Sequence, residues 1–187
     1  MDAAIEVMAR EGVAHTTTRA IVAEAGMQIG VFHYCFRSKE ELILEVGRTI
    51  GRRSFAAVLE VLRGSTDPAE IIHRSTRAFW ERLRDHPLEH LLSYELTQYA
   101  LRQPGDEPAA VQQYDAYYAG LERFLTTVAE IGGCTWSTPV DQLARLTLAT
   151  VDGITFQWVV SRDETMVLLL LERVAEQLCA DAGLVSQ

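Results

Sequence analysis

The sequence has few features of a membrane or secreted protein. Its longest unbroken apolar run, Met166–Leu171, is far shorter than the roughly 20 residues of a membrane-spanning helix. No basic stretch leads into an apolar core at the N-terminus, so we expect no secretory signal. The cysteines, Cys35, Cys134 and Cys179, are odd in number and widely spaced, which suits a reducing compartment and gives no CxxC metal pattern. We therefore expect a cytoplasmic protein without a membrane partner, a metal or another cofactor.

Positive charge is also scarce. The 187 residues include 17 Lys plus Arg against 26 Asp plus Glu, and the net charge is −9 at pH 7. Taken as a whole, this acidity argues against a nucleic-acid partner. However, basic and acidic residues balance within residues 1–53, and all of the excess negative charge lies in residues 54–187. The asymmetry predicts two parts that meet different partners.

Sustained alternation of apolar and polar residues, the signature of half-buried strands, is missing. The hydrophobic fraction of 48% and the mean hydropathy of +0.02 indicate a folded chain rather than a disordered one. The periodicity predicts an all-α fold of about nine helices. The expected helices begin near residues 2, 16, 28, 38, 67, 87, 138 and 161, and one more follows a polar linker that is expected at residues 103–108.

Several helix starts have recognisable capping residues. Ser38 and Glu41 fit a capping box, and Asp67 followed by Pro68 gives a cap and an N1 proline. Ser161 and Glu164 fit a second capping box for the last helix. These signals fix where the helices begin more firmly than periodicity alone.

Residues 16–36, TTTRAIVAEAGMQIGVFHYCF, have the pattern of a helix-turn-helix. Gly26 permits the positive φ that a tight turn between two helices often needs. In the second of these helices, Ile29, Phe32 and Phe36 follow a spacing that predicts burial. That leaves an outward set, which consists of Gln28, Gly30, Val31, His33 and Tyr34.

The outward set suits a DNA groove. Glutamine can read adenine edges, and valine can meet a thymine methyl group. His33 and Tyr34 can reach phosphates or base edges, and the small Gly30 allows close approach. For Tyr34 an alternative is a place at the edge of the core.

The order of a first helix, Gly12, a Thr-rich cap, A-E-A-G, an aromatic third helix and F-R-S-K-E-E-L resembles the TetR family of bacterial transcriptional regulators over residues 2–46. The resemblance implies a three-helix DNA-binding domain at residues 1–46 and a ligand-binding and dimerisation domain at residues 47–187. It further implies a homodimeric repressor that a small molecule releases from a pseudo-palindromic operator. An activator or a ligand-independent regulator of the same fold is the alternative.

The resemblance carries over to individual positions. Thr17 and Lys39 match family positions that contact phosphate, and residues 28–31 match the start of the recognition helix. The residues expected to face DNA are Thr17, Thr18, Gln28, Ile29, Gly30, Val31, His33, Tyr34 and Lys39. Met27 and Gln28 replace a small Val-Ser pair, so the base preference of relatives cannot be borrowed, and Cys35 stands where an aromatic residue or histidine is common. Met1 lies inside the expected first helix, so the basic arm of relatives is either absent or outside the sequence given.

The middle of the chain is rich in aromatic residues with polar groups, which need partners when they are buried. A helical cavity lined by them suits a flat or hydrophobic effector, although ordinary core packing is the alternative for each residue. The candidate ligand-binding residues are Trp80, Leu83, Leu91, Tyr94, Tyr117, Tyr118 and Phe124.

The last two helices have apolar residues on more faces than one protomer can cover, which predicts a four-helix dimer interface. A fully buried central helix in a monomer is the alternative. The candidate interface residues are Leu146, Thr150, Gly153, Ile154, Gln157, Val167, Leu168, Leu171 and Val174.

Catalytic chemistry has weak support. His86 and His90 are spaced to bind a metal from one helix face, but a solvated face explains them better. Ser93 and Cys134 lack a base partner, and no Gly-rich phosphate loop follows a strand. We expect no enzyme, with an all-α enzyme or a small-molecule-binding protein as the minor alternatives.

Overall fold

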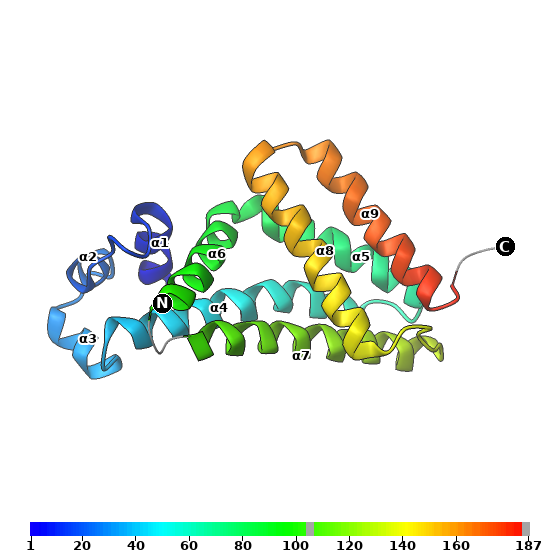
Figure 1. Ribbon diagram of the computed structural model, residues 1–187, viewed down its shortest axis with the longest axis horizontal. Coiled ribbons are helices and arrows are strands. Elements are labelled where there is room, and N and C mark those ends of the chain that lie inside the picture. Colours follow the sequence, from blue (N-terminus) through cyan, green and yellow to red (C-terminus); the bar gives the residue numbers. More distant parts are fainter. Residues whose placement is uncertain (104–106, 185–187) are drawn as a thin grey trace. The chain divides into compact units, whose positions relative to one another are not determined.

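The computed structural model describes residues 1–103 and 107–184, and every regular element within those ranges is a helix (Figure 1). The all-α prediction is therefore confirmed. The central residues of the predicted linker at 103–108 lie outside the described part. The elements are α1 (Asp2–Glu11), α2 (Thr18–Glu24), α3 (Ile29–Cys35), α4 (Lys39–Glu60), a 3-10 turn (Val61–Arg63), α5 (Pro68–Asp85), α6 (Pro87–Arg102), α7 (Glu107–Gly132), α8 (Val140–Ser161) and α9 (Glu164–Asp181).

Two of the predicted caps form hydrogen bonds. Ser38 Oγ accepts from the Glu41 backbone N–H at 3.2 Å, and the Glu41 carboxylate accepts from the Arg37 N–H at 2.7 Å. Asp67 Oδ1 accepts from the Ala69 N–H at 2.9 Å, next to Pro68 at the start of α5. The side chains thus satisfy backbone donors that the first helical turn leaves without a partner.

The predicted capping box at the start of α9 is wrong. Asp163 is the N-cap, and its carboxylate accepts from the Met166 N–H at 3.0 Å. Ser161 still belongs to α8, which ends only when Arg162 adopts a left-handed φ of 57°. Because α8 continues to Ser161, that residue cannot serve as the non-helical cap of the next helix.

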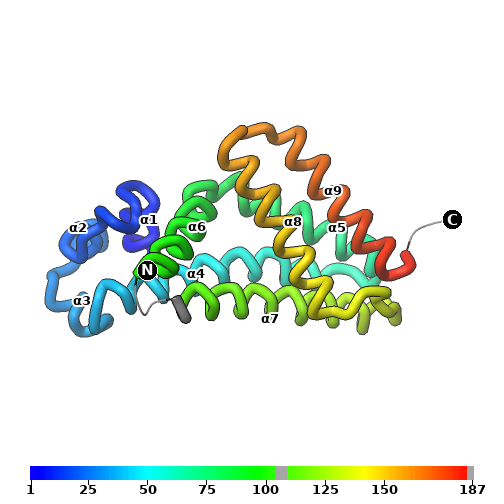
Figure 2. Tube along the Cα trace, viewed as in Figure 1, coloured from blue at the N-terminus to red at the C-terminus, as the bar shows by residue number. Residues whose placement is uncertain are grey.

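The described residues form two compact units, each with its own core. The first unit comprises the described parts of Met1–Arg52 and His86–Tyr114, and the second those of Arg53–Asp85 and Asp115–Gln187. In the first unit α1 packs against α2 and α6, and α2 packs against α3. In the second unit α9 runs beside α5 and α8, as the tube in Figure 2 shows. The predicted domain boundary at residue 46 remains a prediction.

Burial within the second unit divides the predicted dimer residues. Four of the nine lie in the core of their own chain, which argues against a contact with a partner: these are Ile154, Val167, Leu171 and Val174. The other five are exposed, namely Leu146, Thr150, Gly153, Gln157 and Leu168. Periodicity identifies apolar faces, but it does not show which face the neighbouring helix covers. None of the described helices combines the length and the hydropathy needed to cross a membrane.

Candidate nucleic-acid interface

The N-terminus of α2 is held by two threonines with different roles. Thr17 is the N-cap in extended conformation, and its Oγ1 accepts from the Ala20 N–H at 3.1 Å. Thr16 is buried and donates its hydroxyl to the Gly12 carbonyl at 2.7 Å. Thr17 itself is exposed, so its hydroxyl proton remains available to a phosphate beside the positive end of the helix.

The turn between α2 and α3 is a Schellman motif centred on Gly26. The Met27 N–H donates to the Val22 carbonyl at 2.8 Å, and the Gly26 N–H donates to the Ala23 carbonyl at 3.0 Å. Gly26 has a φ of 64°, a conformation that residues with a Cβ adopt at a cost. The motif ends α2 sharply and sets the direction in which α3 begins.

The helix α3 presents most of its side chains to solvent. Phe32 is buried in the core of the first unit, as predicted, and Phe36 packs at its edge with ring centroids 5.7 Å apart. Ile29, the first residue of α3, is 41% exposed, which overturns its predicted burial. Tyr34 is 92% exposed and therefore does not belong to the core edge.

Most of the predicted DNA-facing residues are thus exposed on α2 and α3, whereas Thr18 is half-buried. Gln28 is the N-cap of α3 and makes no capping bond with its side chain. Gly30, Val31 and His33 are exposed as well. Sequence reasoning missed Met27, which is 55% exposed beside them, and Arg19, an exposed cation on α2. Met27 could have been found from its place directly before the recognition helix.

Lys39 has an intramolecular partner that the sequence did not reveal. Its Nζ donates to the Val13 carbonyl at 3.0 Å, while the Val13 N–H donates to Glu95 Oε1 of α6 at 2.6 Å. Both polar groups of one buried loop residue are therefore held by charged side chains, one from α4 and one from α6. Hydrogen bonds to charged groups are stronger than neutral ones, so this Val13 clasp fixes the loop that leads into α2.

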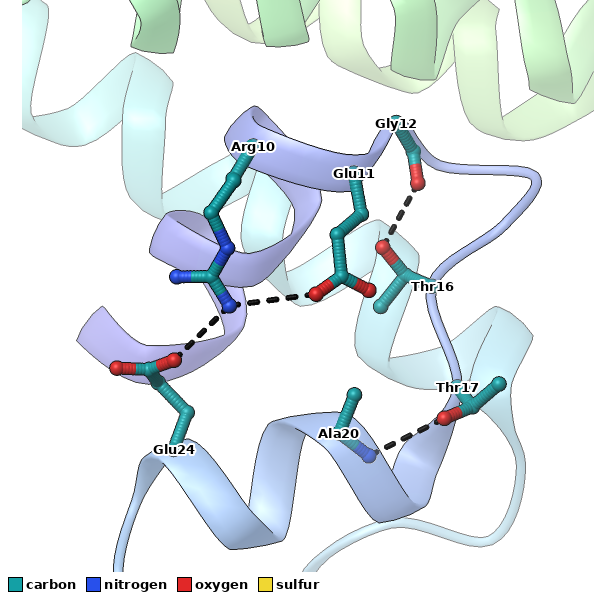
Figure 3. A network of polar contacts seen from close by, with 7 residues as sticks. All are labelled: Arg10, Glu11, Gly12, Thr16, Thr17, Ala20 and Glu24. Carbon is teal, nitrogen blue, oxygen red and sulfur yellow. Dashed lines mark hydrogen bonds and ion pairs between the residues drawn. The ribbon is translucent and has the colours of Figure 1, made fainter.

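Arg10 adds a surface network between α1 and α2 (Figure 3). Its Nη2 lies 3.0 Å from Glu24 Oε2 and 3.2 Å from Glu11 Oε1. The hydrogen bonds that Arg10 donates to Glu24 and, with a smaller effect, to Glu11 raise the pKa of Arg10. The network is exposed and adds little stability, but it occupies a basic group that would otherwise be available to DNA.

The predicted ligand residues fall into both units. Trp80, Leu83 and Phe124 are buried in the core of the second unit, where Tyr117 and Tyr118 are half-buried. Leu91 and Tyr94 belong to the first unit, and Leu91 is exposed. Sequence reasoning missed Thr155 and Trp158 of α8, which are also buried in the second unit.

The predicted solvated face is wrong for one of the two histidines. His86 is exposed at the N-cap position of α6, where its side chain makes no capping bond, but His90 is buried. Among the described residues, no group of three potential metal ligands comes together.

A Cys-His-Glu row does occur between α5 and α9. His73 Nε2 lies 3.8 Å from Cys179 Sγ, and His73 Nδ1 lies 3.1 Å from Glu172 Oε1. Burial, with smaller contributions from Asp67 and Glu172, raises the pKa of the Cys179 thiol. A raised pKa keeps the thiol protonated, so the row does not supply an activated nucleophile.

Comparison with known proteins agrees with this geometry. Residues 1–46 match the family described as bacterial regulatory proteins, tetR family. The HTH-type nicotine-responsive transcriptional repressor HdnoR of Paenarthrobacter nicotinovorans is 27% identical over 158 residues, which cover 84% of this chain and 80% of the repressor.

Solved structures extend the likeness to the whole fold. A putative TetR-family transcriptional regulator from Rhodococcus sp. superposes with a TM-score of 0.80 at 17% identity, covering 97% of this chain and 95% of that one. The multidrug binding protein EbrR, complexed with imidazole, has a TM-score of 0.65 at 27% identity, covering 92% and 90%. The chain is thus similar to TetR-family transcriptional regulators, by the family match over residues 1–46 and by fold over most of its length.

Proposed function

We propose that this protein is a TetR-family regulator that represses transcription by placing α3 in the major groove of an operator. The observation that carries the proposal is the exposed face of α3, which follows a capped and rigidly turned α2. In this arrangement Gln28 and Val31 meet base edges, and Thr17 meets a phosphate. The neutral charge of residues 1–53 makes non-specific binding weak, so base contacts have to supply much of the selectivity.

A homodimer completes the proposal. On α8 the exposed residues Leu146, Gly153, Phe156 and Val160 follow helical spacing and form one stripe, which we call the α8 stripe. We propose that two copies of the stripe pack around a two-fold axis. A dimer that binds an operator presents its two recognition helices one DNA turn apart, about 34 Å. The operator is then pseudo-palindromic, and the protein acts in the cytoplasm.

A small, largely hydrophobic or aromatic effector is the proposed release signal. Support comes from the buried aromatic residues of the second unit and from two similar proteins, one nicotine-responsive and one complexed with imidazole. Trp80, Leu83, Tyr117, Tyr118 and Phe124 are the candidates that share one unit. The effector would shift the population away from the DNA-binding state.

Fluorescence anisotropy with DNA from the region upstream of the protein's own gene tests the proposal. We expect a sequence-selective complex that weakens with salt, and an unrelated duplex of equal length is the control. Equal binding to both duplexes would reject the function. Release of the operator by nicotine or a related heterocycle would support repression with induction, whereas tighter binding would indicate an activator or a co-repressed regulator.

A further inference from the structure

Two polar atoms of α8 are buried without a hydrogen bond. Thr155 is 2% exposed and Trp158 is 3% exposed. Within residues 1–103 and 107–184, neither Thr155 Oγ1 nor Trp158 Nε1 has a partner. Because they are three residues apart on one helix, the two side chains share a face, and we call them the α8 polar pair.

Thr155 differs from other helical hydroxyls in this protein. Thr150, one turn earlier on the same helix, donates to the Leu146 carbonyl at 2.8 Å. Ser75 in the core of the same unit donates to the Ile71 carbonyl at 2.8 Å. Threonine in a helix readily makes this bond to the carbonyl four residues back. Thr155 does not, although burial removes water as an alternative partner.

Trp158 is held in a fixed orientation. Its ring makes a T-shaped contact with Trp80, at a centroid distance of 5.4 Å and an interplanar angle of 86°. The guanidinium of Arg162 lies over the same ring at 4.5 Å. Packed on two sides, the indole cannot turn its N–H toward another acceptor. A buried donor that the surrounding packing fixes without a partner weakens the fold, and such groups are rare in native proteins.

We propose that the α8 polar pair is the polar anchor of the effector site, and that it binds a neutral heteroaromatic or carbonyl compound through one hydrogen-bond acceptor. The indole N–H is a donor only, and the threonine hydroxyl can donate as well, so both can converge on a single oxygen or ring nitrogen. The surrounding core is apolar, which favours a neutral ligand because moving an ion out of water is costly, and the Arg162 guanidinium beside the indole disfavours a cation. This inference rests on the proposed function and specifies the ligand chemistry of its regulatory site.

Stability of the ligand-free protein gives the first test. Thr155→Val and Trp158→Phe remove groups that only a ligand would satisfy. The matched controls are Thr16→Val, whose buried hydroxyl bonds Gly12, and Trp136→Phe, whose Nε1 donates to the Leu125 carbonyl at 3.0 Å. We expect Thr155→Val to keep or raise the melting temperature and Thr16→Val to lower it. Trp158→Phe should lower the melting temperature less than Trp136→Phe does. Destabilisation by Thr155→Val as large as by Thr16→Val would show a structural role and overturn the proposal.

Binding gives the second test, with pyridine as the probe and benzene as its control without an acceptor. The chain has three tryptophans, so its three indole N–H resonances can be assigned from Phe variants. We expect pyridine, but not benzene, to shift the Trp158 resonance. Thr155→Val should weaken pyridine binding about two- to tenfold. No shift at Trp158, or equal shifts with both compounds, would overturn the proposal. A wild-type protein that fails to bind DNA would instead count against the proposed function.

Discussion

Gln28 and Lys39 differ in what holds their side chains. Gln28 makes no capping bond at the start of α3, whereas Lys39 already donates to Val13. We expect Gln28→Ala to change which base is preferred at one operator position, because it removes a base contact worth about 1–3 kcal/mol of discrimination. Anisotropy against single-base operator variants measures this change. An equal loss on every variant would contradict it.

Lys39→Ala should instead weaken binding to all operators. If the Lys39 amine reaches a phosphate, the slope of log affinity against log salt should fall by about one. If Lys39 acts only through Val13, affinity should fall while the salt slope stays unchanged. Salt titrations of the wild type and Lys39→Ala decide between these roles. Arg19→Ala, which removes an exposed cation on α2, is the comparison variant.

Gly26 matters through its backbone conformation alone. Apart from its chain neighbours, no described residue has an atom within 4 Å of the Cβ that a substitution would add, but its φ of 64° is unfavourable for L side chains. We expect Gly26→Ala to destabilise the first unit by about 1–2 kcal/mol. Gly30, which is equally open but helical, is the control, and Gly30→Ala should stabilise by up to about 1 kcal/mol. Denaturant unfolding of both variants measures the difference, and equal effects would refute the explanation.

At the scale of elements, Glu95 joins α6 to the loop between α1 and α2. Glu95→Ala leaves the buried Val13 N–H without its acceptor, so we expect a loss of about 1–3 kcal/mol and weaker operator binding. Glu95→Gln keeps an acceptor, so it should retain more of the stability and more of the operator affinity. Unfolding and anisotropy of the two variants provide the measurement. Identical behaviour of Glu95→Ala and wild type would show that the clasp does not position α2.

Asp181 at the end of α9 holds the loop that leads into α8. Burial acts to raise its pKa, but hydrogen bonds from Thr138 and Ser137 outweigh it and lower the pKa overall. The Thr138 and Ser137 hydroxyls lie 2.7 and 2.8 Å from Asp181 Oδ1. Because its pKa is lowered, the carboxylate stabilises the fold at pH values above the pKa of the unfolded chain, which is about 4. This contribution disappears as the pH falls through the pKa of the folded state.

We therefore expect Asp181→Asn to lower the melting temperature at pH 7, and the gap to wild type to close as the pH falls below about 4. The exposed Asp115 of α7 is the control, and Asp115→Asn should have little effect at either pH. Melting curves across this range test the sign. A gap that widens on acidification would contradict the assignment.

Local sequence signals predicted the elements well where the chemistry is local. Ser38, Asp67 and Gly26 act within a few residues of themselves, so their caps and turn could be predicted without knowing the rest of the fold. The prediction that Ser161 caps the last helix was wrong because the end of α8 depends on the backbone conformation of Arg162. That conformation does not follow from the capping pattern. The predicted burial of Ile29 was wrong because its exposure depends on what packs around the first turn of α3.

At the scale of the whole molecule, the α8 stripe should control assembly. Val160 is 72% exposed, so we expect Val160→Glu to weaken dimerisation at least about tenfold by placing a charge in the proposed interface. Operator binding should fall with it, because a dimer engages two half-sites. Val111→Glu on α7, where the valine is 57% exposed, is the control and should leave both unchanged. Light scattering measures the mass. A monomeric wild type at micromolar concentration would contradict the proposed dimer.

The sequence by itself determined the helical fold, the helix-turn-helix and the neutral charge of the part that carries it, because periodicity, caps and charge are properties of neighbouring residues. Only the tertiary structure decided which apolar face is core and which is free, and so separated Ile154 and Val167 from Leu146. It also revealed that Lys39 and Glu95 hold Val13, and that Thr155 Oγ1 and Trp158 Nε1 have no hydrogen-bond partner within the described part of the chain. These features depend on residues far apart in the chain, whose meeting no local pattern encodes.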